Sequence, residues 1–170
     1  SLPEPTTPRT GDGSGSVELR DVTFGYVDKP VLVDVAFHAQ PGTVTAFVGP
    51  SGSGKTTIAR LISRFWDVDS GAVMVDGVDI RELGTEQLMS RLSMVFQDVY
   101  LFDDSLIANI RVGRPDASDE EVFRAADLSG VTSIANRLGW HTPVGEGGRL
   151  LSGGERQRVS VARALLKQAP

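Results

Sequence analysis

The residues best suited to chemistry stand at positions 49–56, which read Gly-Pro-Ser-Gly-Ser-Gly-Lys-Thr and match the pattern G-x-x-x-x-G-K-[ST]. Glycines allow backbone N–H groups to approach phosphate oxygens without an intervening Cβ, and a helix starting near Lys55 directs its positive end at the same anion. Lys55 places a point charge on the β- and γ-phosphates, and Thr56 offers a hydroxyl to Mg²⁺. The pattern predicts a nucleoside triphosphate site, but it does not choose among kinase, GTPase and ATPase.

A second glycine pair opens the last predicted helix, in the run LSGGERQR at residues 151–158. Ser152 is a good N-cap residue, and with Glu155 it makes an S-x-x-E capping box. Gly153 and Gly154 leave the N–H groups of the first turn uncovered, which suits that turn to an anion. On physical grounds two interpretations stay open: an ordinary capped helix, or half of a phosphate site that a second copy completes.

Taken together and in this order, the two runs closely resemble the Walker A and signature motifs of the nucleotide-binding domain of ATP-binding cassette (ABC) transporters. The resemblance extends from Val17 to the last residue. It implies that two such domains pack head to tail, with each ATP held between Walker A of one and the signature of the other. The residues implied to bind ATP are Tyr26, Gly49, Pro50, Ser51, Gly52, Ser53, Gly54, Lys55, Thr56 and Thr57. Those implied to contact the ATP of the partner are Leu151, Ser152, Gly153, Gly154, Glu155 and Gln157.

Single positions gain further roles from the same resemblance. Tyr26 matches the aromatic residue that stacks on adenine, although by itself the run FGY equally suits a core or surface tyrosine. Gln97 matches the glutamine that reaches Mg²⁺ and the attacking water, so the implied catalytic residues are Gln97 and Lys55, and the implied magnesium ligands are Thr56 and Gln97. Glu146, in the run at 142–148, resembles the acidic residue that exporter-type members place against the membrane domain.

The family continues, after a helix of this kind, with an apolar strand that ends in Asp-Glu and supplies acids for Mg²⁺ and water. This chain stops at Pro170, where that strand would begin, so none of its residues is assigned to those roles. Burial of about five apolar side chains contributes on the order of 10 kcal/mol, comparable with the whole stability of a domain. We therefore expect the isolated 170-residue chain to be marginally stable and to hydrolyse ATP only at a background rate.

These motifs need elements that position them. Alternating apolar residues predict strands at 17–24 and 31–39, a β-branched run predicts a buried strand at 43–48, and 93–96 reads as another strand. Asp76-Gly77 predicts a hairpin within 72–80, and Ser118 with Glu121 predicts a capped helix. The expected fold is α/β, a P-loop NTPase (RecA-like) with a parallel core, an N-terminal antiparallel β region and a helical signature subdomain at about 98–151. Residues 1–16, rich in Pro, Gly, Ser and Thr, are interpreted as a linker from an upstream transmembrane domain, followed by the nucleotide-binding domain at 17–170.

Composition excludes several alternative functions. The formal net charge is −5 and the sequence pI about 5.0, which argues against a nucleic-acid partner. The chain has no cysteine, so disulfides and thiolate metal sites are absent. No run of 18 apolar residues is present. His38 and His141 have no spaced ligand partners, and we assign neither a metal nor a base role.

The resemblance implies the ATP-binding part of a membrane transporter, at the cytoplasmic face of the cell membrane, with its transmembrane domain in the same parent chain. The runs at residues 97–110 and 144–148 resemble exporter-type members, and the sequence as a whole faintly resembles one half of an actinobacterial iron-siderophore transporter. Lipid, peptide or drug export are alternatives for the substrate. Two further alternatives are a soluble ABC ATPase that acts on DNA or ribosomes, and a nucleotide-binding module without turnover.

Overall fold

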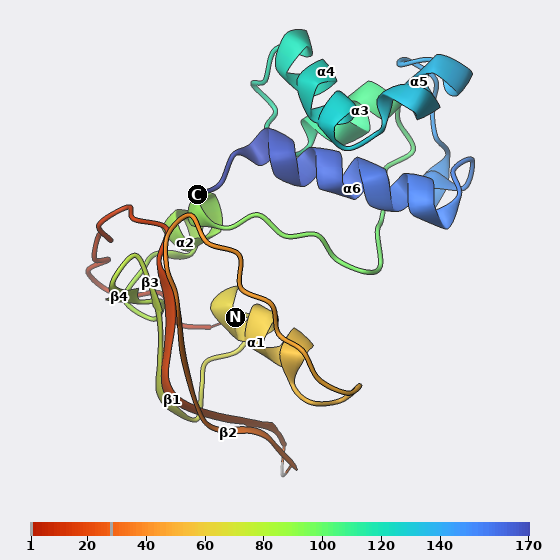
Figure 1. The fold of residues 1–170 in the computed structure, drawn as a ribbon. Helices are drawn as coiled ribbons and strands as arrows, with labels where there is room; N and C mark the ends of the chain where they lie inside the picture. The colour runs from red at the N-terminus through yellow and green to blue at the C-terminus, as the bar shows by residue number, and fades with distance from the viewer. Residues whose placement is uncertain (1, 28) are drawn as a thin grey trace. The chain divides into compact units, whose positions relative to one another are not determined.

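The computed structural model describes residues 2–27 and 29–170 of the chain. They divide into two compact units with a boundary between Leu92 and Ser93, the first holding the phosphate-loop motif and the second the signature motif. Figure 1 shows the first unit as strands with two short helices, and the second as a group of helices around one longer helix.

An antiparallel sheet of four strands, in the order β2-β1-β3-β4, forms the frame of the first unit. The strands are β1 Val17–Tyr26, β2 Lys29–Ala39, β3 Ser70–Val75 and β4 Val78–Asp79. In β1 the register slips against both neighbours next to Asp21, whose φ of 47° lies in the left-handed region, as at a β-bulge. Asp76 and Gly77, at φ 52° and 73°, make the two-residue turn of the β3–β4 hairpin, so the hairpin predicted within 72–80 is confirmed.

Two helices accompany this sheet, α1 Lys55–Ile62 and α2 Thr85–Arg91. Their buried leucines join the inward face of the strands, so that Leu61 and Leu88 share one apolar core with Leu19 and Val73. Since α1 starts at the phosphate loop, burial of Ile58 and Leu61 fixes the direction in which the loop faces.

The expected parallel strands do not form. Residues 43–48 and 93–96 belong to no strand, and Val44 and Val48 are 98% and 94% exposed. A strand exists only where a neighbour accepts and donates its backbone hydrogen bonds, and every strand pairing among the described residues is antiparallel. The mixed α/β class and the N-terminal antiparallel region are thus confirmed, while the parallel pairing is absent from this part of the chain.

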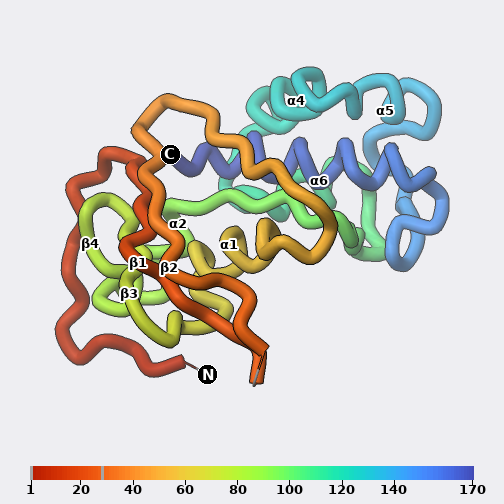
Figure 2. The backbone as a smooth tube through the Cα atoms, turned by 60° about the horizontal axis from the view of Figure 1, so that its bottom comes forward, coloured from red at the N-terminus to blue at the C-terminus, as the bar shows by residue number. Residues whose placement is uncertain are grey.

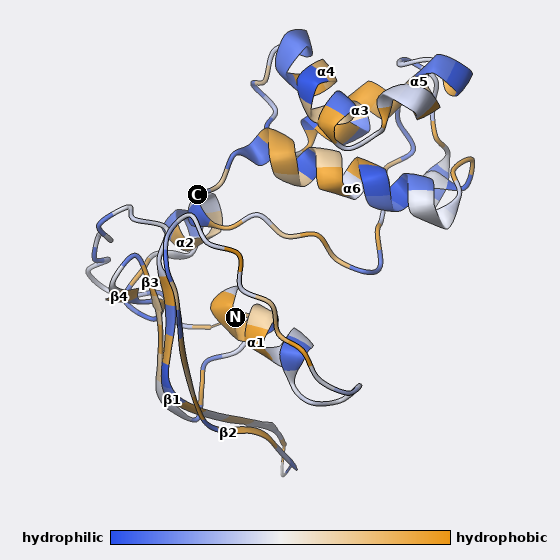
Figure 3. Cartoon of the chain, in the orientation of Figure 1, coloured by the Kyte–Doolittle hydropathy of each residue, from blue (hydrophilic) through white to orange (hydrophobic). Residues whose placement is uncertain are grey.

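The second unit is helical. Its elements are α3 Leu106–Arg111, α4 Asp119–Leu128, α5 Thr132–Leu138, the short 3₁₀ turn η1 Glu146–Gly148 and α6 Gly153–Lys167. The middle and C-terminal turns of α6 carry most of its apolar residues, as the orange segments of Figure 3 show, and Val159, Ala162 and Leu166 are fully buried there. They share one apolar core with buried residues of the three other α-helices of this unit, such as Ile110 of α3. Among the described residues no helix is both long enough and apolar enough to cross a bilayer.

Candidate nucleotide-binding site

Two glycines of the phosphate loop have backbone angles that any other residue would adopt only with strain. Gly52 and Gly54 adopt φ values of 82° and 88°, in the left-handed region that side chains disfavour. At Gly54 a Cβ would also lie only 2.7 Å from Leu32 Cδ2, which belongs to the buried core. The loop therefore enters α1 by a route open to glycine alone.

The start of α1 has donors without acceptors. Its N-cap residue, Gly54, provides no side-chain acceptor, and no acidic residue stands in the first turn. Within residues 2–27 and 29–170, the N–H groups of Lys55, Thr56 and Thr57 have no protein acceptor. Three open N–H groups at the positive end of a helix form a site for an anion.

The Lys55 side chain folds back over the loop. Its Nζ donates to the carbonyl oxygens of Gly49 and Pro50 at 3.0 and 2.7 Å, and to Ser53 Oγ at 3.1 Å. The ammonium group is thus held where the loop curves around it, with Ser51 and Gly52 exposed at the rim. A phosphate oxygen bound by the same loop would meet this charge directly.

Tyr26 lies next to α1, as the interpretation of an adenine-stacking residue requires. Its hydroxyl is 3.4 Å from Thr57 Oγ1, and its ring makes edge contacts with Phe24 at 5.0 Å and with Trp66 at 5.2 Å. Tyr26 is half-buried, whereas Phe24 is 4% exposed and belongs to the core of the first unit. The contact with Trp66 was not predicted, although the adjacent aromatic pair Phe65-Trp66 after α1 is a visible signal in the sequence.

The start of α6 differs, because side chains of its own residues accept hydrogen bonds from some of its backbone N–H groups. Ser152 Oγ accepts from Glu155 N at 3.3 Å and Glu155 Oε2 accepts from Ser152 N at 2.8 Å, so the predicted capping box is confirmed. The pKa of Glu155 lies below its ordinary value. The main cause is the hydrogen bond from the Ser152 backbone N–H, and the ion pair with Arg137 lowers the pKa further. Gly153 and Gly154 are exposed, and in the described chain their N–H groups have no acceptor.

Other signature residues support this turn. Leu151 is 3% exposed and anchors the chain in the core of the second unit, while Arg156 Nη1 donates to its carbonyl at 2.8 Å. Gln157 Nε2 reaches Phe96 O at 3.5 Å, at the outer limit of a hydrogen bond. Gln157 thereby links α6 to the segment that leads into Gln97.

Gln97 and Glu146 are both exposed. Gln97 lies in a bend after residues 93–96, and Glu146 begins η1 between glycines at positive φ. His141 is also exposed, and no group of three His, Cys, Asp or Glu residues suited to a metal lies within the described residues.

A buried polar network in the second unit was not predicted. Asn109 is fully buried, and its side-chain amide bonds the backbone of Phe102, Asp104 and Ser105 at 2.9–3.2 Å. Arg163 of α6 donates to Asn109 Oδ1 and to Asn109 O, both at 2.7 Å, and burial lowers its pKa. This network fixes the loop between Gln97 and α3 against α6. The side chains gave no sequence signal beyond a lone Asn and Arg on helices.

The structure thus brings Tyr26 and the phosphate loop together in the first unit. In the second unit it places the signature turn on the helix that carries Arg163. Each group is arranged to receive an anion, the first through an open helix start and a lysine, the second through two exposed glycine N–H groups.

Comparison with known proteins supports the resemblance seen in the sequence. Residues 32–170 match the family model described as ABC transporter. The chain is 52% identical over 164 residues to the mycobactin import ATP-binding/permease protein IrtB of Mycolicibacterium thermoresistibile, covering 95% of this chain and 28% of that protein. It is 46% identical over 160 residues to the mitochondrial iron-sulfur clusters transporter ATM1 of Yarrowia lipolytica, covering 92% and 22%.

Among solved structures, a bacterial Atm1-family ABC exporter with ATP bound matches with a TM-score of 0.93 at 43% identity. The match covers 98% of this chain and 30% of that one. The chain therefore spans less than a third of the length of the relatives that it matches.

Proposed function

The chain belongs to the ABC transporter family as an ATP-binding domain of exporter type, and from this premise we propose that it drives the movement of a substrate across a membrane by binding and hydrolysing ATP. The observation that carries the proposal is the start of α1. A glycine N-cap without a side chain, three open N–H groups and the folded-back Lys55 form a phosphate site with no other evident use.

In this proposal the loop from Gly49 to Thr57 surrounds the phosphates. Lys55 leaves its carbonyl acceptors and neutralises the β- and γ-phosphate oxygens, which are stronger acceptors because they are charged. The residues present fit a magnesium ion, since Thr56 is exposed in the first turn of α1 and supplies the hydroxyl expected of a ligand. Bound magnesium supplies charge stabilisation at the phosphates, and Gln97 is the proposed residue for orienting the attacking water.

Tyr26 is the proposed adenine platform. Its two aromatic neighbours fix the plane of the ring, and the contact with Thr57 keeps it beside the first turn of α1. A fixed ring loses little conformational entropy when a base stacks on it, which favours affinity without base selectivity.

The signature turn is proposed to act on the nucleotide of a partner domain. The run Leu151–Glu155 holds its own capping box, so Ser152 already has one acceptor in use, while the N–H groups of Gly153 and Gly154 stay open. Such a turn is formed before any ligand arrives. This preformed turn favours a partner that is a second ABC domain, identical or related. The turn and Gln157 would contact the ATP bound to that partner.

We further propose a transmembrane domain in the same polypeptide, contacted through the exposed Glu146, and a location at the cytoplasmic face of the membrane. For the substrate we favour a siderophore, because the relative named for mycobactin import is 52% identical. A relative named for β-(1→2)glucan export in Bradyrhizobium diazoefficiens is still 46% identical over 159 residues, covering 92% of this chain and 26% of that protein. Sequence identity within an ATP-binding domain is therefore only a weak guide to which substrate is transported.

A soluble ABC ATPase and a binding module without turnover are the alternative functions. A titration with a fluorescent ATP analogue, together with a phosphate-release assay, separates an ATPase from a binding module. The proposal expects saturable binding that Lys55→Met weakens, and turnover that requires the dimerised parent protein. Binding without turnover in the full-length protein would select the module, and loss of binding by the wild-type chain would refute the proposal.

A further inference from the structure

Residues 2–16 do not extend away from the first unit but lie along it. In Figure 2 this red segment runs outside β4 and β3 before it enters β1. Hydrogen bonds hold it at three places, and we call the segment the N-terminal strap.

The first place is the turn between β3 and β4. Asp12 N donates to Asp76 O at 3.1 Å and Gly15 N donates to Asp76 Oδ1 at 2.6 Å, while Asp76 N donates to Ser16 O at 3.0 Å. Asp76 is 3% exposed, so its carboxylate requires these partners and the ion pair with Arg91. At Gly11 a Cβ would lie 2.4 Å from Asp76 Cβ, which shows how closely the strap approaches.

The second place is the loop that precedes α2. Arg9 N donates to Glu82 O at 2.8 Å, and the Arg9 guanidinium forms an ion pair with the Glu82 carboxylate at 2.7 Å. The ion pair is exposed and contributes little stability. The backbone hydrogen bond, however, fixes the register of the strap beside residues 82–85.

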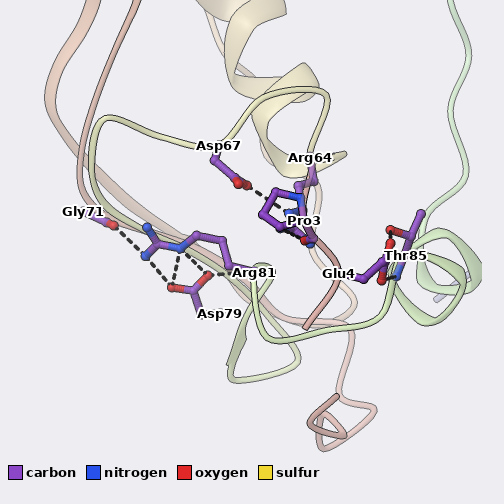
Figure 4. A network of polar contacts seen from close by, with 8 residues as sticks. All are labelled: Pro3, Glu4, Arg64, Asp67, Gly71, Asp79, Arg81 and Thr85. Carbon is purple, nitrogen blue, oxygen red and sulfur yellow. Dashed lines mark hydrogen bonds and ion pairs between the residues drawn. The ribbon is translucent and has the colours of Figure 1, made fainter. Parts of the chain in front are cut away.

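The third place joins two helices, as Figure 4 shows. Glu4 accepts hydrogen bonds from the Thr85 N–H, at 3.1 Å, and from the Thr85 hydroxyl. The N-cap residue of α2 is Gly84, which has no side chain to cap the helix, so the carboxylate of Glu4 acts as the cap. One residue earlier, Pro3 O accepts from Arg64 Nη2 at 2.9 Å.

Arg64 terminates α1 in an unusual way. Its N–H donates to Leu61 O and the next N–H, of Phe65, donates to Arg60 O, which is the hydrogen-bond pattern of a Schellman motif. The residue at this position adopts φ 53° and is ordinarily glycine. Arg64 instead carries a side chain only 6% exposed, held by Asp67 Oδ1 at 2.9 Å and by the strap.

We propose that the strap clamps the end of α1 to the start of α2, so that docking of residues 2–16 and binding of nucleotide at the other end of α1 stabilise each other. The inference rests on the proposed function of the phosphate loop. An α1 of eight residues places the strap about 12 Å from the loop, along a rigid element. A pull on the chain before Leu2 would then release Arg64 and Thr85 first and lower nucleotide affinity.

Two substitutions test the clamp in the full chain. Arg64→Gly removes the strap contact yet supplies the residue that a Schellman motif prefers, so it spares the fold of α1. Glu4→Gln weakens the cap on α2, and Glu86→Gln, a neutralisation on α2 itself, is the matched control. Hydrogen–deuterium exchange with and without ADP reads the docking of Arg9, Asp12 and Gly15 amides, and the β3 amides verify that each variant is folded.

The clamp predicts slow exchange in the strap, slower still with ADP. It predicts that Arg64→Gly speeds this exchange and raises the ADP Kd about fivefold, the lower end of usual coupling, with a smaller effect of Glu4→Gln and none of Glu86→Gln. A released strap with an unchanged Kd would overturn the clamp and leave the proposed function intact. Fast strap exchange in the wild-type chain would also overturn it. Absence of any ADP binding would refute the proposed function as well.

Discussion

The starts of α1 and α6 both contain glycines, at the N-cap of α1 and in the first turn of α6, and they satisfy their N–H groups in opposite ways. At α1 the N-cap Gly54 supplies no acceptor, and the first-turn N–H groups stay open beneath the folded-back Lys55. At α6 the capping box of Ser152 and Glu155 satisfies two donors within the chain. Side chains, water or ligands satisfy the N–H groups of a helix start, so α1 leaves its first donors to water or a ligand, whereas α6 satisfies two donors with its own residues.

Under the proposed function, one domain contributes two unlike halves of a site. The start of α1 leaves three donors open for an anion, which suits a loop that binds its own nucleotide. The start of α6 is folded before any ligand arrives and exposes only two glycine N–H groups. Variants that alter one helix start and leave the other unchanged separate these properties. Changes at α1 should affect nucleotide affinity, and loss of the cap at α6 should affect stability.

Removal of the Lys55 charge is expected to have the largest effect. A hydrogen bond to a charged group contributes about 1.5–3 kcal/mol, so Lys55→Met should weaken nucleotide binding about 10- to 100-fold. Lys167→Met, at the far end of α6, should leave the affinity unchanged. Isothermal titration with ATP measures both. Equal affinities of Lys55→Met and the wild type would show that the loop is not the phosphate site.

The glycines of the two helix starts should respond with opposite sign. Gly54→Ala forces a side chain into φ 88° and against Leu32, and should destabilise the first unit by about 1–3 kcal/mol. At Gly154 an added Cβ meets nothing within 4 Å, so Gly154→Ala should stabilise the second unit by about 0.5 kcal/mol.

Urea unfolding resolves these effects because each unit has one tryptophan. Trp66 reports on the first unit and Trp140 on the second, and these are the chain's two tryptophans. Each glycine variant is paired with a background in which the other tryptophan is phenylalanine. Destabilisation by both glycine variants would contradict the proposed difference.

Loss of the α6 cap should cost stability but not binding. Ser152→Ala is expected to destabilise the second unit by about 1 kcal/mol while the chain keeps its affinity for ATP. Ser118→Ala removes the same capping box from α4 and is the matched control, with a similar loss. If Ser152→Ala alone weakened ATP binding by the monomeric chain, the signature turn would act on the nucleotide of its own chain.

The smallest effect is a pH dependence. The pKa of Glu155 is lowered by the hydrogen bond from the Ser152 backbone and by Arg137, so the folded state favours the carboxylate. This contribution to stability is fully present above the ordinary glutamate pKa and is lost as the pH falls through the lowered value. Acid titration of the Trp140 signal should therefore be shallower in Glu155→Gln. An identical slope in the variant would contradict a role for the ionised carboxylate.

Local motifs allowed the phosphate loop, both capping boxes and the β3–β4 hairpin to be predicted, because each depends on residues within a few positions. The strands expected at 43–48 and 93–96 depend on neighbours that a pattern of apolar residues does not name. The strap escaped prediction because residues 2–16 have the composition of a linker, and their partners Asp76 and Thr85 are far away in the sequence. Arg64 in place of glycine gave no signal, since its conformation follows from contacts of its side chain.

We propose that the monomeric chain binds nucleotide at α1 and not at α6. An NMR titration with ADP of a chain whose glycines are isotopically labelled, at concentrations at which it is monomeric, distinguishes the two helix starts. We expect the amides of Gly49, Gly52 and Gly54 to shift together with saturation, while those of Gly153 and Gly154 do not move. Equal shifts of both groups, or shifts of the signature pair alone, would contradict it.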